Sequence, residues 1–156
     1  MKRIVAIGLA LALGIIAGSL ACSGGGSGAR IEIGAIALKQ ASFAQTIIDV
    51  QVRAENKTKA DAVLERIEYD IYVGRKGKWI WLAREAEGAW TIPPGPPTDF
   101  TVTTVIEEAQ LRRTIEEYIF GTEPTDIKVD GYGLFKMADD SIEVHFSKTT
   151  RVDTEQ

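Results

Sequence analysis

The chain has 156 residues, of which 45% are hydrophobic and 26% charged, and its formal net charge is −4. This length and composition fit one folded domain and argue against disorder of the whole chain. A pI near 5.1 provides no basic surface for phosphates, and one Cys with one His excludes an internal disulfide framework and the usual zinc clusters. We therefore expect no nucleic-acid partner, no metal and no cofactor.

The N-terminal segment has the features of an export signal. Met1–Arg3 is basic, and residues 4–20 are apolar or small without a charge. A basic start, an apolar run and small residues at its end are typical of a secretory signal peptide. Cys22 directly follows Ser19-Leu20-Ala21, and the four residues resemble the lipobox of bacterial lipoproteins. In that family the Cys is lipidated and becomes the first residue of the mature protein.

The resemblance at Cys22 implies how the chain is divided and where it is located. We predict a lipoprotein-type signal peptide at 1–21, the lipidated Cys and a Gly/Ser-rich tether at 22–29, a folded domain at 30–150 and a C-terminal tail at 151–156. Removing 1–21 leaves 135 residues and a net charge of −6, from 16 basic and 22 acidic side chains. The mature protein is expected outside the cytoplasm, anchored to the cell membrane by lipid. An ordinary cleaved signal and an uncleaved anchor are the alternatives.

From residue 30 onward, apolar residues recur with a period of two, which is typical of half-buried strands. About seven strands are predicted, at 30–38, 46–54, 63–73, 79–86, 100–106, 127–135 and 142–146. Residues 90–92 are followed by four prolines within 93–97. Because proline cannot donate to a strand ladder, this stretch is predicted as an edge or a loop.

One segment has a helical period instead. Leu111, Ile115, Tyr118 and Ile119 fall on one helical stripe, and acidic residues precede it while Gly121 follows it. This predicts one α-helix at about 107–120. Strands with a single helix favour a mainly β fold, an antiparallel two-sheet sandwich of the immunoglobulin or fibronectin type.

Candidate catalytic groups are few. No Ser lies in a Gly-x-Ser-x-Gly elbow, and the lone His145 is expected on the exposed face of a strand. Asp139, Asp140 and Glu143 fall short of a calcium loop and are better explained as part of a polar hairpin turn. We predict no catalytic residue, no enzymatic activity and no small-molecule substrate.

Three tryptophans are the candidates for a partner surface. Trp79, Trp81 and Trp90 could form a stacking platform, although packing within the fold is the commoner role for such residues. Trp79 and Trp81 alternate with Ile80 and Leu82, so both faces of this strand are apolar. One face is therefore expected to meet either a partner or the predicted helix.

Four segments resemble, in order, the water stress and hypersensitive response (WHy) domain of the second, folded group of late embryogenesis abundant (LEA) proteins. They are a strand ending in Asn, a long strand ending in Gly, an Ile-Pro-Pro-Gly turn and the strand after it: Ile48–Asn56, Leu64–Gly74, Trp90–Gly95 and Phe100–Val105. The resemblance covers about 31–148. The family usually has Pro after this Asn, where this chain has Lys57.

The resemblance implies a compact sandwich linked to desiccation and stress, with no active site to carry over. The function expected from it is protection of neighbouring proteins or membrane by a non-enzymatic, membrane-anchored domain. The alternative is an Ig-like envelope lipoprotein that binds a protein partner or helps an assembly form, through an exposed strand or the tryptophans.

Overall fold

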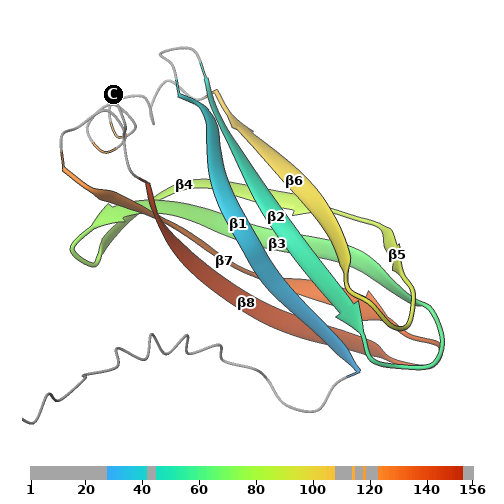
Figure 1. Cartoon of the computed structure of the whole chain (residues 1–156). Helices are drawn as coiled ribbons and strands as arrows, with labels where there is room; N and C mark the ends of the chain where they lie inside the picture. The colour runs from blue at the N-terminus through green and yellow to red at the C-terminus, as the bar shows by residue number, and fades with distance from the viewer. Residues whose placement is uncertain (1–27, 42–44, 108–113, 115–117, 119–122, 153–156) are drawn as a thin grey trace, which may run out of the picture.

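The computed structural model describes residues 28–41, 45–107, 114, 118 and 123–152. These residues form two antiparallel sheets, one ordered β1-β2-β6 and a larger one ordered β4-β3-β7-β8, with β5 also paired to β3. Figure 1 shows the smaller sheet lying over the larger one. The strands are β1 (Ala29–Ala41), β2 (Thr46–Asn56), β3 (Ala62–Arg75), β4 (Lys78–Glu87), β5 (Trp90–Ile92), β6 (Thr98–Ile106), β7 (Thr125–Lys136) and β8 (Ser141–Val152). The predicted two-sheet antiparallel sandwich is confirmed.

The described residues contain eight strands where about seven were predicted, because residues 90–92 pair with β3. Ile92 lies opposite Ala62 and Trp90 opposite Leu64, on the same edge of β3 that β4 occupies further along. The prolines that follow end this strand after three residues, as expected for residues that lack an N–H.

The helix predicted at about 107–120 lies almost entirely outside the described residues. Within that stretch the structure describes Glu107, Thr114 and Tyr118, of which the last two have helical backbone. The extent of the helix stays a prediction.

The core lies between the two sheets and follows the period of two. On β2, Val50, Val52 and Ala54 are buried, whereas Gln51 and Arg53 between them are exposed. The largest fully buried side chains are Tyr69, Phe135, Ile48, Leu64, Ile67, Ile71, Leu82, Ile92, Ile127, Val50 and Val52. Burial of these apolar groups from both sheets is the main force that holds the sheets together.

Two aromatic rings of the core meet over a glycine. Gly131 on β7 lies opposite Tyr69 of β3 on one side and Phe146 of β8 on the other. The rings of Tyr69 and Phe146 approach edge to face, with centroids 6.4 Å apart and an interplanar angle of 63°. Because Gly131 has no side chain, Tyr69 packs closely against it: a Cβ atom at Gly131 would lie only 2.5 Å from the Cβ of Tyr69.

Asn56, the last residue of β2, joins the two sheets. Its side chain is 1% exposed, and its Nδ2 donates to the carbonyls of Ala60 (2.8 Å) and of Ile92 in the larger sheet (2.9 Å). Its Oδ1 accepts from the backbone N–H of Thr58 (3.0 Å) and from the Thr58 hydroxyl (2.7 Å). Every polar atom of this buried amide therefore has a partner, which buried polar groups require.

Candidate interaction surface

The outer face of the larger sheet carries two of the three candidate tryptophans. Trp79 lies opposite Gly74 and Trp81 opposite Tyr72, both pairs formed between β3 and β4. A Cβ atom at Gly74 would lie 2.7 Å from Cε3 of Trp79, so the indole fills the space above this glycine. Trp79 is half-buried, whereas Trp81 is 48% exposed.

Strand β4 is apolar on both faces because Trp79 and Trp81 alternate with Ile80 and Leu82, and a β-bulge follows Trp81. Ile71 pairs with Ala83 and Tyr72 pairs with Trp81, so Leu82 is an extra residue between the two pairs. Leu82 is buried, and the bulge turns it toward the core while Trp81 stays on the outer face. The inner face thus meets the core of the chain itself, and Trp81 presents its ring to the outside.

A lysine lies against the aromatic pair next to Trp81. Lys128 Nζ is 4.5 Å from the centroid of the Tyr72 ring and 5.2 Å from that of Trp79. Both distances are within the range of a cation–π interaction. The ammonium group fixes the aromatic side chains of neighbouring strands relative to one another.

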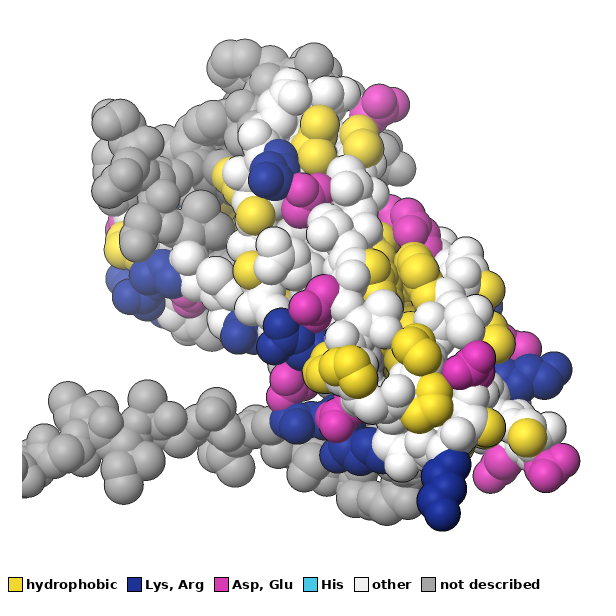
Figure 2. Space-filling model, turned by 45° about the vertical axis from the view of Figure 1, so that its right-hand side comes forward, with side chains coloured by type: hydrophobic (Ala, Val, Ile, Leu, Met, Phe, Trp, Pro, Cys, Tyr) yellow, Lys and Arg dark blue, Asp and Glu magenta, His cyan; other side chains and the backbone are white. Residues whose placement is uncertain are grey.

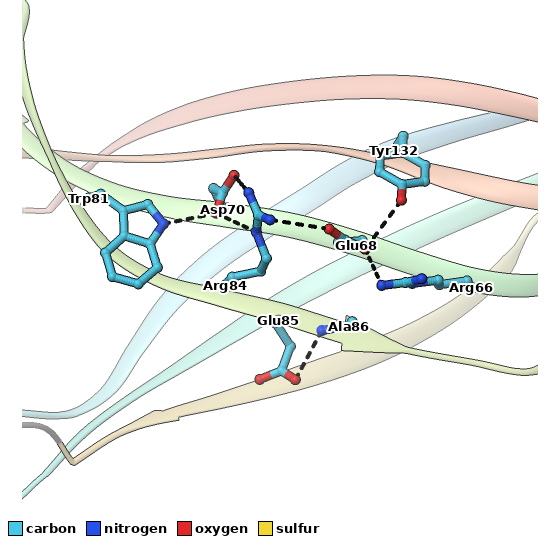
Figure 3. Close-up of polar contacts among 8 residues, drawn as sticks. All are labelled: Arg66, Glu68, Asp70, Trp81, Arg84, Glu85, Ala86 and Tyr132. Atoms are coloured by element: carbon cyan, nitrogen blue, oxygen red, sulfur yellow. Dashed lines mark hydrogen bonds and ion pairs between the residues drawn. The ribbon is translucent and has the colours of Figure 1, made fainter.

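Hydrogen bonds to Asp70 hold the ring of Trp81 in place (Figure 3). Trp81 Nε1 donates to Asp70 Oδ1 at 2.8 Å. Arg84 donates to the same carboxylate through Nε (3.0 Å to Oδ1) and Nη2 (2.8 Å to Oδ2). The hydrogen bonds from Arg84 and then Trp81 lower the pKa of Asp70 below its ordinary value, so Asp70 is a carboxylate at neutral pH.

The charges continue from Asp70 along β3. Glu68 forms ion pairs with Arg66 and with Arg84, the latter at 3.6 Å, and it accepts a hydrogen bond from the Tyr132 hydroxyl at 3.2 Å. Figure 3 shows these side chains in one row along the strand. We call Arg66, Glu68, Asp70 and Arg84 the charged ladder. Its two cations and two anions balance, so the ladder offers hydrogen bonds without a net charge.

Trp90 lies apart from the other two tryptophans. It pairs with Leu64 of β3, whereas Trp79 pairs with Gly74, so the two lie about 30 Å apart along the strand. Its ring stacks on Phe100 of the smaller sheet, with centroids 4.3 Å apart and an interplanar angle of 21°. The structure therefore brings Trp79 and Trp81 together and uses Trp90 to pack one sheet on the other.

The remaining candidate residues lie on β8, in the turn before it or outside the described residues. Cys22, with the whole of 1–27, is outside them. His145 is exposed, with Nε2 2.8 Å from Glu143 Oε1. The turn after β7 is closed by the Met137 N–H, which donates to the Asp140 carbonyl at 2.8 Å. Within the described part of the chain, no three His, Cys, Asp or Glu side chains are grouped to hold a metal ion.

Across the same described residues, none of the helical structure has the length and apolar character needed to cross a membrane.

Sequence reasoning missed the role of Asp70 and the charged ladder. The only signal was alternation, which placed Asp70 on the outer face of its strand opposite a strand with an outward tryptophan. The hydrogen bond between Asp70 and Trp81 depends on the register of β3 and β4, which periodicity alone does not give.

No protein-family model matches the sequence, and no curated protein matches it. Solved structures do share its fold. A protein from Archaeoglobus fulgidus is similar over 83% of this chain and 98% of its own, with a TM-score of 0.55 and 18% identity.

Two further solved structures share the fold, and one of them is named as a LEA protein. A candidate late embryogenesis abundant (LEA) protein, At2g46140.1, is similar over 80% of this chain and 70% of its own, with a TM-score of 0.60 and 11% identity. The protein AT1g01470 from Arabidopsis thaliana is similar over 78% of this chain and 79% of its own, with a TM-score of 0.53 and 11% identity. The chain is thus a two-sheet β-sandwich protein with a LEA-like fold.

Proposed function

We propose that the chain is a non-enzymatic protein, held at the outer side of the cell membrane by a lipid on Cys22, that protects neighbouring proteins or membrane during water loss. The observation that carries the proposal is the LEA-like fold, shared with At2g46140.1 over 80% of this chain. The lipobox-like sequence before Cys22 supports the anchor, and the WHy-like segments support the link to desiccation.

The place where the chain enters the sandwich fits a short tether. Lys57 donates its backbone N–H to the Gly28 carbonyl at 2.7 Å, and β1 begins at the next residue. Gly28 lies six positions after Cys22. Six residues span at most about 20 Å when extended, so a lipid at Cys22 would hold the domain close to the bilayer.

The surface supports a role that needs no single ligand. On the outer face of the smaller sheet, Arg53 and Asp99 form a bidentate ion pair, and the Thr103 hydroxyl donates to Asp49 at 2.7 Å. Figure 2 shows a face on which acidic, basic and small hydrophobic groups are interspersed. Such a surface keeps water bound through charges and hydroxyls and lacks the single-sign field that attracts other macromolecules. A hydrated body of this kind would separate neighbouring proteins as they concentrate.

Protection of a labile enzyme through drying tests this proposal. We expect the purified protein to preserve more enzyme activity after drying and rehydration, or after freeze–thaw, than an equal mass of an unrelated acidic β-sandwich domain. The unrelated domain controls for simple dilution and crowding. Protection no better than that domain would rule out direct shielding.

The second candidate function is a protein-binding or assembly module in the envelope. It is favoured by Trp81, a 48% exposed aromatic side chain whose ring is fixed by the hydrogen bond to Asp70. Rigid, exposed aromatic groups are common anchors of protein interfaces.

A pull-down from the envelope tests this second function. The double variant Trp79→Ala/Trp81→Ala is expected to fold and to lose co-purified partners, because the anchor is removed from an outer face. Val105→Ala is the matched control, since among the described residues Val105 is the other large exposed hydrophobic residue and it lies on the smaller sheet. Partners retained by the double variant, or lost equally from both, would contradict a binding role for the tryptophans.

A further inference from the structure

Strand β8 presents a long unpaired edge. Among the described residues it pairs only with β7, from Ser141 opposite Lys136 to Val152 opposite Thr125, with no shift in register. The outer strand of the smaller sheet on the same side, β1, has its register broken twice. An uninterrupted edge exposes a row of backbone donors and acceptors that can pair with another strand.

The outward side chains of β8 are complementary to themselves. In an antiparallel pair of two β8 strands centred on Ser147, Glu143 of each copy lies opposite Arg151 of the other, and His145 lies opposite Thr149. A second register, centred on Phe146, also uses nearly the whole strand and keeps inward and outward residues on the same faces of the joined sheet. That register places Glu143 opposite Thr149 and pairs no charges. The Ser147-centred register is therefore favoured by two cross-strand ion pairs.

These ion pairs are compatible with the contacts already present. Arg151 Nε lies 3.4 Å from Asp126 Oδ1 on the neighbouring β7, and the remaining donors of its guanidinium can reach a second carboxylate. Glu143 contacts His145 through one oxygen, Oε1, which leaves Oε2 to accept from an arginine.

An open groove beside the β8 edge also favours the addition of a strand that would cover it. It has a volume of about 390 Å³ and lies between β1 and β8, lined by residues 30–34, Arg53 and residues 145–148. Three core residues at this side, Ile31 (6%), Ile33 (7%) and Phe146 (8%), are more exposed than most of the core, much of which is at 0%. Core residues are therefore more accessible along this groove than in most of the core (Figure 1 shows β1 and β8 side by side).

The same register would cover the groove. In the dimer, β8 of the second copy extends the larger sheet of the first copy beyond its own β8. The inward side chains of this added strand lie on the face of the sheet that is turned toward β1 of the first copy. These include Val144 and Phe146, which alternate with the outward residues. Lys148 would lie opposite Phe146 of the other copy, where its aliphatic stem can pack on the ring while its ammonium group stays in water.

We propose that the chain forms a two-fold symmetric dimer in which the β8 strands of two copies pair antiparallel about Ser147. The larger sheets of the two copies then form one continuous sheet. The interface is isologous, so each copy contributes the same strand. Pairing uses the β8 edge of both copies, and the assembly is therefore complete with two copies. This dimer is independent of the protective or partner-binding role proposed above.

Disulfide trapping of the full chain in membranes tests the dimer. At the two-fold axis the two copies of residue 147 face each other directly, within the distance that a disulfide bridges. Ser147→Cys is expected to give a cross-linked dimer on oxidation. The matched control on the same strand is Thr149→Cys, which faces His145 of the other copy and is too far from its own counterpart to cross-link. The unaltered chain controls for any linkage through Cys22.

Reversing a charge on the β8 edge is the decisive part of this cross-linking experiment. In the Ser147→Cys background, Glu143→Arg is expected to lower the cross-linked fraction about tenfold, because it places four cations around the axis. Adding Arg151→Glu restores opposite charges across the pair and is expected to restore cross-linking. Cross-linking of Thr149→Cys equal to that of Ser147→Cys, or a yield unaffected by Glu143→Arg, would overturn the proposal.

Discussion

Replacing Asn56 with alanine is expected to lower the free energy of unfolding by about 3–5 kcal/mol, a large part of the stability of a domain of this size. The substitution removes four hydrogen bonds and leaves the buried carbonyl of Ile92 and the half-buried N–H of Thr58 without their partner. It also cuts the polar link between β2 of the smaller sheet and β5 of the larger one. Urea denaturation followed by tryptophan fluorescence measures the change.

Two further variants make this result specific to the amide of Asn56. Gln51→Ala removes an exposed amide from the same strand and is expected to change stability by no more than about 0.5 kcal/mol. Asn56→Asp keeps the acceptor for Thr58 but aims a second, charged oxygen at the carbonyls of Ala60 and Ile92.

The aspartate variant has a predicted pH dependence. Burial against two carbonyls raises the pKa of an Asp at position 56 above its unfolded value of about 3.9, so the folded state binds the proton more tightly. The stability contributed by the protonated form is fully present below the unfolded pKa and is lost as pH rises through the folded pKa. The free energy of unfolding of Asn56→Asp should therefore come closer to that of the unaltered chain as the pH falls from 7 to 4. The loss of stability in Asn56→Ala should not change over this range. A deficit constant with pH would contradict the assigned hydrogen bonds.

Gly131→Ala is expected to destabilise the domain by about 3 kcal/mol, even though it adds one methyl group. A Cβ at this position would lie 2.5 Å from Cβ and 2.7 Å from Cα of Tyr69, and closer still to the Glu68 carbonyl oxygen. Two of these three atoms belong to the backbone and the third is the Cβ attached to it, so a side-chain rotation cannot relieve the overlap. The β3–β7 pairing would therefore have to open locally to admit the methyl group.

Gly34→Ala is the matched control for Gly131, since both glycines lie in strands. At Gly34 the nearest atoms to an added Cβ belong to Gln51, at 3.7 Å, which is ordinary van der Waals contact. We expect a change within about 0.5 kcal/mol or a small gain from the reduced entropy of the unfolded chain. Thermal unfolding of the two variants side by side separates the clash from a general intolerance of strands to alanine. Equal losses at the two positions would refute the packing argument.

The sandwich could be predicted from sequence because burial in these strands has a period of two. On β2 the alternation of Ile48, Val50 and Val52 with outward polar residues identified the inward face, and the structure confirms it. The short β5 was harder, since three residues before a run of prolines carry almost no periodic signal. Its pairing with Ala62–Leu64 depends on a partner strand that precedes it in the chain by more than twenty residues.

The candidate surface could be predicted only in part. Alternation placed Trp81 on one face of its strand, but the bulge at Leu82 arises from the pairing with β3 and has no signature in β4 alone. The same limit applies to Asn56. The sequence marks a polar turn after it, whereas its bond to Ile92 joins residues 36 positions apart. Local patterns give faces and turns, and registers between distant strands come from packing of the whole domain.

The position of Gly28 has a mechanical consequence. The chain enters β1 at one end of the sandwich, and the β3–β4 hairpin around Arg75 and Lys78 lies at the other end (Figure 1). Tension between the N-terminal segment and a contact at that far end acts lengthwise along β1. The hydrogen bonds to β2 run across this direction, from Ala29 opposite Asn56 to Ala41 opposite Thr46, so the load shears the ladder as a whole instead of opening it pair by pair. The domain is thus joined to its leading segment in the orientation in which a pair of strands best resists being pulled apart.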